Sequence, residues 1–426
     1  MDEQSTGPFI ETGEDVVQDA MRAGVFVDEL PNIRKRRRLT VKRWIREGGQ
    51  SSHQPLFIRE VAMPIKAAVM TAPEAPMEVW VLPDPVIENG GVLLETIASE
   101  VCGTDVHLHH GRLEGVPYPI VPGHVSVGRV LEAPGVGADA VGASLSVGDV
   151  VTFLDVHEVC GSCYHCLVVR QPNRCPSRKV YGITYGAEDG PFGGWAERIY
   201  LQPGVRILRL PEGVRGDDFI GGGCGLFTGF AAVERSEIAM GDTVVVQGSG
   251  PVGLSAAAFA NLRGAGLVIL IGSPAARIQL GYALGADTAF DLATTTVEDR
   301  VAEVLALTKN RGADVVIEAS GNPLAVTEGF DLLRDGGTYV IAGHYTDAGE
   351  TPFNPHLHVN RKHVVVKGQW GTEFHHLVGA LRLLGRHCDR LPFADMVGGR
   401  YPLEDAGKAL EDVAGLRVTK AIITPG

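Results

Sequence analysis

The stretch Thr243-Val244-Val245-Val246-Gln247-Gly248-Ser249-Gly250-Pro251-Val252-Gly253 decides the fold of the second half of the chain. Its apolar run is typical of a buried strand, and the small residues that continue to Ala260 favour a helix. Gly248 permits a tight turn, Gly250 lets the backbone approach a pyrophosphate, and Gly253 lets the helix pack on the strand. The helix begins at Pro251 and Val252, and the free N–H groups of its first turn, which start after Pro251, attract phosphates. The stretch therefore predicts a dinucleotide site, and the alternative is an ordinary glycine-rich turn.

Strand and helix patterns alternate beyond this stretch. Strands are expected at 267–271, 314–318 and 338–341, with helices ending near 285 and spanning 324–333. Because these strands are continuously apolar, they indicate a parallel sheet covered on both faces, as in a doubly wound α/β domain. Residues 64–220 look β-rich instead, with short strands expected at 67–70, 91–96 and 150–154.

The second strand of the alternating region ends in Gly272-Ser273, where an acidic residue would hold the ribose 2′-hydroxyl of NAD. No Asp or Glu stands there, and Arg277 follows a few residues later. Two interpretations of Arg277 stay open: it meets the 2′-phosphate of NADP, or it is a solvated helix residue. The pattern favours tolerance of NADP without deciding between the two cofactors.

Composition argues against several classes of function. The chain of 426 residues has a formal net charge of -13, which disfavours nucleic acid as a partner because phosphates are bound by excess Lys and Arg. No run of about 18 apolar residues occurs, so we expect no membrane span. The start Met1-Asp2-Glu3 is not followed by an apolar signal-peptide core, and a cytoplasmic location is expected.

Residues 1–62 differ from the rest of the chain. They begin acidic and then carry the basic run Arg34-Lys35-Arg36-Arg37-Arg38. We interpret the segment as a flexible solvated tail, or as an extension ahead of a start at Met63. The alternative interpretation is a patch for nucleic acid or for import.

Four of the seven cysteines, Cys160, Cys163, Cys166 and Cys175, fall within sixteen residues. In a reducing compartment such clustering indicates metal binding rather than disulfides. Four thiolates close the tetrahedral shell of zinc and leave no position for water, so this lobe, residues 157–178, is predicted to hold a structural zinc. His165 lies within the lobe as a surplus candidate, and the alternative is four free buried thiols.

A second set of metal ligands is spread over three segments. These are Cys102-Gly103-Thr104-Asp105-Val106-His107, Gly123-His124 and Gly222-Gly223-Cys224-Gly225. Three protein ligands, Cys102, His124 and Cys224, would leave the fourth position of a zinc ion open for water or an alcohol. An open zinc is a Lewis acid that lowers the pKa of a bound hydroxyl. Taken singly, each residue is equally consistent with a buried core position.

Together these motifs resemble the zinc-dependent alcohol dehydrogenases of the medium-chain dehydrogenase/reductase superfamily, from about Met63 to the C-terminus. The resemblance rests on the three ligand segments, the four-cysteine lobe, Cys224-Gly225-Leu226-Phe227-Thr228-Gly229 and the glycine-rich stretch, in matching order. It implies two zinc ions per chain, NAD or NADP, and a homo-oligomer, either dimer or tetramer. It also implies a GroES-like catalytic domain at 63–225, a Rossmann domain at 226–369 and a return to the catalytic domain at 370–426.

The resemblance further implies roles for the site residues. The catalytic zinc would be bound by Cys102, His124 and Cys224. Thr104 would contact the substrate hydroxyl and begin a proton relay, and His107 would pass the proton toward solvent. Asp105 would orient His124, as carboxylates do for metal-bound imidazoles. For Thr104 and His107 the alternative is local turn capping. Weaker candidates for the pocket wall are Asp155, Val156 and His157.

Two positions depart from the family pattern. The family usually has Glu directly after the zinc-binding His, where it can approach the ion during ligand exchange, but this chain has Val125. The interval from Cys166 to Cys175 is one residue longer than the common pattern, which a loop absorbs. The first departure bears on ligand exchange and not on the presence of zinc.

The expected reaction is reversible hydride transfer between an alcohol, a small-molecule substrate, and NAD(P), giving an aldehyde or ketone. Two alternatives stay open: a zinc-free quinone or enoyl reductase of the same fold, and a non-catalytic nucleotide-sensing protein. The intact ligand set argues against the first. The presence of Thr104 and His107 beside that set argues against the second.

Overall fold

The computed structural model describes residues 64–426 and, upstream, the backbone of two short antiparallel strands, β1 (Ile45–Glu47) and β2 (Gln50–Ser52). Residues 1–44, which include the basic run 34–38, and residues 48–49 and 53–63 lie outside the described residues. Within the described part of the chain, no helix is long and apolar enough to cross a membrane.

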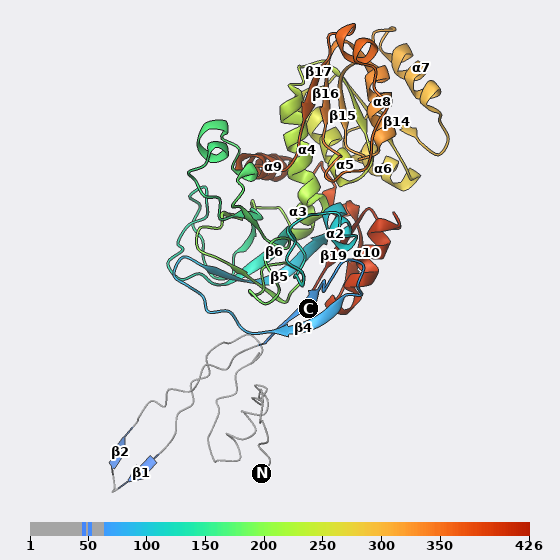
Figure 1. Cartoon of the computed structure of the whole chain (residues 1–426). Helices are drawn as coiled ribbons and strands as arrows, with labels where there is room; N and C mark the ends of the chain where they lie inside the picture. The colour runs from blue at the N-terminus through green and yellow to red at the C-terminus, as the bar shows by residue number, and fades with distance from the viewer. Residues whose placement is uncertain (1–44, 48–49, 53–63) are drawn as a thin grey trace. The chain divides into compact units, whose positions relative to one another are not determined.

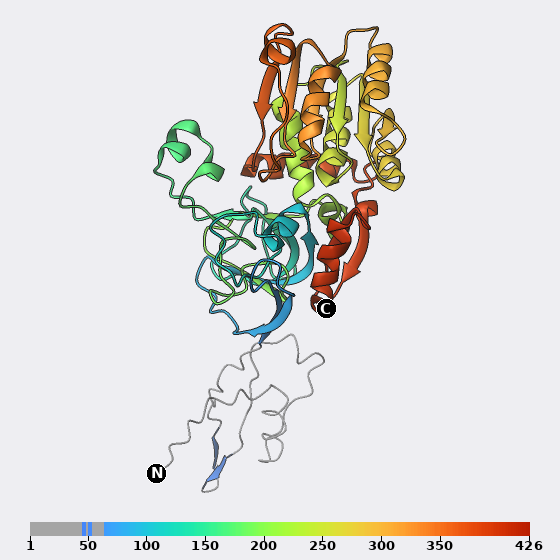
Figure 2. The same cartoon turned by 45° about the vertical axis from the view of Figure 1, so that its right-hand side comes forward.

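A six-stranded parallel sheet forms the core of the second half of the chain (Figures 1 and 2). Its strands are β12 (Thr243–Gln247), β13 (Leu267–Gly272), β14 (Thr288–Asp291), β15 (Ala313–Glu318), β16 (Leu333–Ile341) and β17 (Val365–Gly368). Every neighbouring pair in the order β14-β13-β12-β15-β16-β17 is parallel. Counted along the chain, this order is 3-2-1-4-5-6, that of a doubly wound dinucleotide-binding sheet. The predicted α/β class is confirmed.

Both faces of this sheet are buried, which explains its continuous apolar runs. Val244 and Val246 of β12 belong to one core cluster, whereas Val245 belongs to another that contains Phe330. Alternate residues of one strand therefore face two different cores. The helices around the sheet are α4 (Cys224–Ser236), α5 (Pro251–Arg263), α6 (Ala275–Ala283), α7 (Val297–Leu307) and α8 (Pro323–Leu332).

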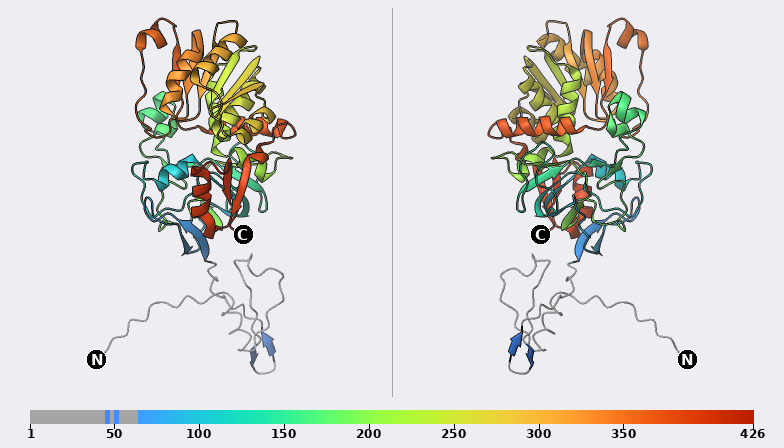
Figure 3. Two further views of the ribbon diagram at one scale, coloured as in Figure 1. Left: turned by 90° about the vertical axis from the view of Figure 1, so that its right-hand side faces the viewer. Right: turned by 90° about the vertical axis from the view of Figure 1, so that its left-hand side faces the viewer.

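A second, mostly antiparallel sheet follows the order β11-β7-β6-β5-β19-β18, and β10 also pairs with β5. Its strands are β5 (Val92–Val101), β6 (Ser126–Glu132), β7 (Val150–Phe153), β10 (Arg198–Leu201), β11 (Ile207–Arg209), β18 (Val397–Tyr401) and β19 (Lys420–Ile423). Strand β19 pairs with β5 and sets Ile422 opposite Glu100. In Figure 3 the C-terminal strands, drawn in red, lie beside the blue-green strands of the first half of the chain. The C-terminal segment thus completes the sheet that the first half of the chain begins.

Shorter elements complete the described part of the chain. The strands are β3 (Ile65–Val69), β4 (Glu78–Leu82), β8 (Val156–His157) and β9 (Lys179–Val180). The α-helices are α2 (Gly103–His109), α3 (Gly216–Gly222), α9 (Phe374–His387) and α10 (Ala406–Ala414). The other helical turns are η2 (His165–Val169), η3 (Pro172–Arg174), η4 (Pro355–Asn360), η5 (Phe393–Met396) and η6 (Leu403–Asp405).

Two strands run well beyond their predicted ends. The strand expected at 91–96 continues to Val101, and the strand expected at 338–341 begins at Leu333. Both extensions contain polar residues, Glu100 in the first and Arg334-Asp335 in the second, that interrupt the apolar pattern. The first extension matters for function because it carries a buried glutamate toward Cys102.

The turn between β12 and α5 depends on its glycines. Gly248 has a φ of +117°, a conformation that favours glycine. A Cβ atom at Gly253 would lie 1.8 Å from the carbonyl oxygen of Gly248, so the helix and the turn are in direct contact. At Gly250 a Cβ atom would meet no other atom within 4 Å. This side of the turn is therefore open to a ligand.

The two glycines should respond differently to substitution in the cofactor-free protein. Gly253→Ala should lower the free energy of unfolding by about 1–3 kcal/mol because the added methyl group overlaps backbone. Gly250→Ala is the matched control, and its effect should stay within about 0.5 kcal/mol. Urea unfolding of both variants measures the difference. Equal losses of stability would show that the contact between Gly253 and Gly248 does not constrain the turn.

Candidate active site

The site begins where β5 ends. Cys102 is the N-cap of α2, and its sulfur accepts a hydrogen bond from the backbone N–H of Thr104 at 3.3 Å. In return, the carboxylate of Asp105 accepts a hydrogen bond from the backbone N–H of Cys102 at 2.9 Å. This capping box fixes the first turn of the helix and the orientation of the Cys102 thiol.

The structure brings Cys102, His124 and Cys224 together from three segments. His124 follows Gly123 just ahead of β6, and Cys224 opens α4 directly after Gly223. The Nε2 atom of His124 lies 3.8 Å from the Sγ atom of Cys102. One donor atom from each of the three residues, with one from Glu100, lies within 4.8 Å of the others.

Burial and mutual charge perturb all three side chains. Burial raises the pKa of the Cys102 thiol, but a hydrogen bond with Cys224 and the charge of His124 outweigh it and hold that pKa well below its ordinary value. Burial lowers the pKa of His124, yet the Cys102 thiolate raises it well above the ordinary value. The hydrogen bond to Cys102 and burial raise the pKa of Cys224. Such strong coupling of thiols and an imidazole is typical of an assembled metal site.

Asp105 lies near His124 but forms no hydrogen bond with it in the structure. The Oδ1 atom of Asp105 and the Nδ1 atom of His124 are both buried and lack a hydrogen-bond partner. Burial and the charge of Cys102 raise the pKa of Asp105 well above its ordinary value, while the charge of His124 opposes this rise. The interaction between the two residues is therefore electrostatic.

Thr104 and His107 lie on the side of α2 that faces a cavity of about 530 Å³. The same cavity is lined by Cys102, His124 and Cys224. The Nδ1 atom of His107 lies 3.3 Å from the hydroxyl of Thr346, and burial lowers the pKa of this half-buried imidazole. A neutral His107 can accept a proton. Asp155 and Val156 also line the cavity, whereas His157 does not.

Apolar and aromatic side chains form one part of the wall of this cavity, and polar side chains such as Glu114, Arg178 and Gln369 form the rest. The apolar and aromatic residues are Leu113, Val156, Val180, Ile183, Phe227, Tyr345 and Trp370. The rings of Tyr345 and Trp370 are stacked, with centroids 5.4 Å apart and an interplanar angle of 10°. The guanidinium of Arg174 lies 4.5 Å from the centroid of the Trp370 ring, so this part of the wall is held by several contacts.

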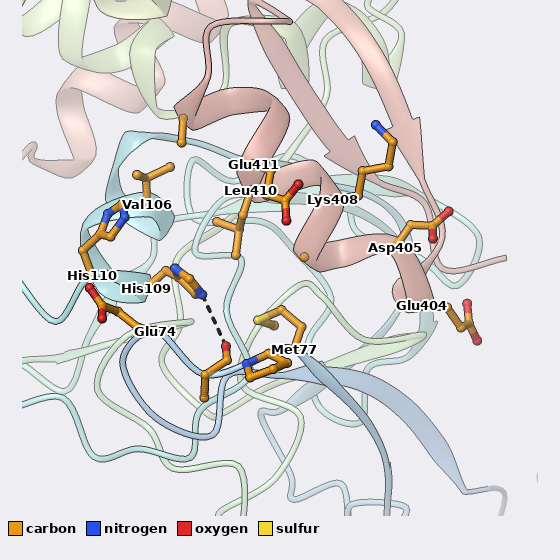
Figure 4. Close-up of a pocket in the computed structure, with 14 residues that line it drawn as sticks. Glu74, Met77, Val106, His109, His110, Glu404, Asp405, Lys408, Leu410 and Glu411 are labelled. Atoms are coloured by element: carbon orange, nitrogen blue, oxygen red, sulfur yellow. Dashed lines mark hydrogen bonds between the residues drawn. The ribbon is translucent and has the colours of Figure 1, made fainter.

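A second cavity, of about 510 Å³, is lined by other residues of the same helix (Figure 4). Val106, His109 and His110 contribute from α2, and Lys408 and Glu411 contribute from α10. None of the cysteines lines it, and His109 is already hydrogen bonded to the backbone oxygen of Ala75 at 3.3 Å. Thr104 and His107 thus line the cavity that contains the candidate metal ligands, whereas Val106 and His109 line the second cavity.

The four-cysteine lobe also assembles. The donor atoms of Cys160, Cys163, Cys166 and Cys175 lie within 4.8 Å of one another, and His165 is not among them. Hydrogen bonds from the backbone and side chain of Ser162 lower the pKa of Cys160 to about 6. Four cysteines close a tetrahedral shell, so the lobe fits a structural zinc.

The dinucleotide residues lie at the carboxyl end of β12, where the strand order of the parallel sheet reverses. The Ser249 hydroxyl donates to the backbone oxygen of Ser273 at 2.9 Å and accepts from its N–H at 3.0 Å, which ties Gly272-Ser273 to the glycine-rich turn. Arg277 is only 8% exposed and donates to the backbone oxygen of Val418 at 2.8 Å. It is therefore not a solvated helix residue. It lines a cavity with Pro251 and Val252.

Sequence reasoning missed two charged residues at the site. Glu100 is 0% exposed and Lys420 is 1% exposed, and their charged groups are 2.5 Å apart. The Glu100 carboxylate also accepts hydrogen bonds from the backbone N–H of Cys224, at 3.0 and 3.1 Å. The available signal was an acidic residue two positions ahead of Cys102, but its lysine partner stands 320 residues away.

The donor set fits zinc. Bond lengths of about 2.3 Å to sulfur and about 2.0 Å to nitrogen, at tetrahedral angles, require sulfur and nitrogen ligands roughly 3.5 Å apart. The observed Cys102–His124 separation of 3.8 Å is close to this value. The orphaned Nδ1 atom of His124 leaves the imidazole free to carry its proton there, which frees Nε2 for a metal.

Comparisons with known proteins agree with this geometry. Residues 88–212 match the alcohol dehydrogenase GroES-like domain, and residues 251–386 match the zinc-binding dehydrogenase family. The chain is 33% identical to 5-exo-hydroxycamphor dehydrogenase of Pseudomonas putida, over 84% of this chain and 98% of the relative. It is 31% identical to sorbitol dehydrogenase of Halalkalibacterium halodurans, over 80% of this chain and 94% of the relative.

Solved structures give the same result. The alcohol dehydrogenase of Thermotoga maritima matches with a TM-score of 0.81 and 33% identity, covering 85% of this chain and all of that one. A zinc-binding dehydrogenase of Sinorhizobium meliloti, solved with NADP, matches with a TM-score of 0.73 and 26% identity, covering 85% and 99%. Fold, donor set and relatives thus agree: the chain belongs to the zinc-dependent alcohol dehydrogenases of the medium-chain dehydrogenase/reductase superfamily, which use zinc and NAD(P).

Proposed function

We propose that Cys102, His124 and Cys224 hold the catalytic zinc and that the four-cysteine lobe holds the structural zinc. The observation that carries this proposal is the convergence of the three donor groups within 4.8 Å from three distant segments. When bound there, zinc supplies a Lewis acid that acidifies an alcohol hydroxyl, and the nicotinamide accepts the hydride. The protein residues position these groups and move the proton.

We propose that the proton leaves through Thr104 and His107. Both line the cavity beside Cys102, which supports contact of the Thr104 hydroxyl with the substrate oxygen. His107 has a lowered pKa and a hydroxyl partner in Thr346, which support its action as an acceptor at neutral pH. The role of Asp105 is to hold His124 by charge, since no hydrogen bond joins them.

For the cofactor, we propose that Gly248, Gly250, Pro251, Val252 and Gly253 receive the pyrophosphate at the start of α5. The open side of Gly250 supports this assignment. Gly272 and Ser273 would lie beside the adenosine ribose, and neither brings the acidic group that would repel a 2′-phosphate. Arg277 would act beside the pyrophosphate or a 2′-phosphate from its buried position.

The substrate that we propose is a secondary alcohol with an apolar, ring-sized body, which yields a ketone. The apolar and aromatic wall of the cavity supports this class. Among the relatives, the names 5-exo-hydroxycamphor dehydrogenase and L-threonine 3-dehydrogenase both describe secondary alcohols.

Three coarser expectations accompany this proposal. We propose that the catalytic domain comprises 63–225 with 370–426, and the Rossmann domain 226–369. The return of β18 and β19 to the first sheet supports this division. A cytoplasmic location is supported by seven cysteines without a disulfide in the described residues. A dimer or tetramer is expected from family membership, and light scattering can measure it.

Metal analysis tests the zinc assignment. The full chain should bind about two zinc ions, and Cys102→Ser should retain about one because only the structural lobe stays complete. Alcohol oxidation by that variant should fall on the order of 10³-fold or more, since several kcal/mol of charge stabilisation are lost. Cys388→Ser is the matched control, and it should keep both ions and full activity. A zinc-free but active chain would instead indicate a reductase of the same fold.

The relay is tested with two substitutions at one position. Thr104→Val keeps the shape but removes the hydroxyl, and kcat should fall about 10²- to 10⁴-fold. Thr104→Ser keeps the hydroxyl and should stay within about tenfold of the parent. Zinc content should be unchanged in both variants. Similar activity of the valine and serine variants would exclude a relay role for the hydroxyl.

A substrate panel tests the proposed alcohol. With NAD and NADP in parallel, kcat/KM for cyclohexanol and for a bicyclic alcohol should exceed that for sorbitol by on the order of 10- to 100-fold. The reason is that the apolar and aromatic part of the wall can bury the ring of these alcohols, whereas sorbitol would place hydroxyl groups against it. Absorbance of the reduced nicotinamide is the readout. Preference for sorbitol or L-threonine would contradict the proposed class.

A further inference from the structure

Glu100 is a buried acid at the metal site for which the roles above have no use. We propose that Glu100 serves, from strand β5, as an exchangeable ligand of the catalytic zinc, and that Lys420 holds its carboxylate in reserve while substrate is bound. It would thereby replace the glutamate that this chain lacks at Val125. The inference rests on the assignment of Cys102, His124 and Cys224 to that zinc.

Glu100 and Val125 are neighbours across the β5–β6 ladder. The backbone N–H of Glu100 donates to the backbone oxygen of Val125 at 3.1 Å, and Ser99 is paired with Ser126. The Val125 side chain is 1% exposed and belongs to an apolar cluster that contains Val127 and Phe219. Because that cluster offers no partner for a charge, a carboxylate at 125 would be costly. In this chain the carboxylate lies instead on the neighbouring strand β5, at Glu100.

The carboxylate of Glu100 is already within reach of the metal position. Its Oε1 atom lies 3.5 Å from the Nε2 atom of His124. It is the fourth donor of the group whose atoms all lie within 4.8 Å of one another. Room for it depends on Gly223, since a Cβ atom there would lie 1.9 Å from the Oε2 atom of Glu100. The residue ahead of the zinc-binding Cys224 is thus small where the carboxylate needs space.

Hydrogen bonds also define the position in which the Glu100 carboxylate stays away from the metal. Lys420 donates to Oε2 of Glu100, and the backbone N–H of Cys224 donates to both carboxylate oxygens. A zinc dication with two thiolates is neutral, and Glu100 with Lys420 is neutral as well. The ion, the two thiolates, the carboxylate and the ammonium sum to zero in either arrangement, so movement of the carboxylate from Lys420 to the ion leaves the net charge of the buried site unchanged. An exchangeable ligand needs this balance.

Chelator challenge of the holoenzyme tests the inference. In Glu100→Gln, the catalytic zinc should dissociate into a chelator about 10- to 100-fold faster than in the parent, the range seen when partners of a metal site are lost. The structural zinc of the same molecule serves as the internal reference and should keep its rate. The double variant Glu100→Gln, Lys420→Met should also release the catalytic zinc faster. It removes the unpaired lysine and guards against misfolding of the single variant.

The opposite effect on the rate of zinc release is expected for Lys420→Met alone. Without the ammonium, the carboxylate is drawn to the ion, so zinc release should become slower and KM for the alcohol should rise several-fold. The visible spectrum of the cobalt-substituted, substrate-free protein should change with the donor set. A purely structural ion pair would instead loosen zinc in both single variants alike. That outcome, or release from Glu100→Gln at the parent rate, would overturn the inference.

Two controls separate this inference from the proposed function. Glu95→Gln, in the same strand and paired with Arg129 near the surface, should leave zinc release unchanged. The zinc content of the parent chain is measured first. Fewer than two ions would contradict the zinc assignment itself and this inference with it, whereas two ions released normally by Glu100→Gln would contradict only the role of Glu100.

Discussion

The antiparallel pairing of β19 with β5 is the constraint on which the site depends. Strand β5 ends at Val101, so its course decides where Cys102 and helix α2 lie. Strand β19 pairs with Ser99–Val101 at the edge of β5 opposite β6, beyond the part of that edge that β10 covers, and it buries Lys420 against Glu100. With partners along both edges, β5 is a central strand. The proposed ligands, the proposed relay residues and the buried ion pair all depend on this arrangement for their positions.

Electrostatics then decides what the assembled site can hold. Two thiols, an imidazole and two carboxylates lie close together, all of them buried except the partly exposed Cys224, and the buried Lys420 is the cation beside them. Without a metal, the thiols and the imidazole must share protons, as the opposite pKa shifts of Cys102 and Cys224 indicate. A divalent ion removes that conflict, because it neutralises the thiolates directly. The site is therefore built for a cation, and the relatives identify which one.

Much of this could be predicted from the sequence, for a physical reason. The glycine-rich turn Gly248–Gly253 and the four-cysteine lobe can each be identified from residues that lie close together in the sequence. The central residues of strands β12, β13 and β15 are continuously apolar because both faces of their sheet are buried, and such runs can be predicted from the sequence. Glu100 could not be assigned, since a lone acid in a strand normally faces water. Its partner Lys420 becomes adjacent only through β19 pairing.

The same connectivity sets the order in which the parts of the site are synthesised. The four cysteines of the proposed structural site lie within sixteen residues and are synthesised together. All the proposed catalytic ligands are present once Cys224 has been added, yet the end of β5 lacks its β19 partner and Glu100 lacks its counter-ion until residues 420–423 follow. The nascent chain therefore holds every proposed zinc ligand almost 200 residues of elongation before this ion pair can form. The last strand completes the buried surroundings of the site.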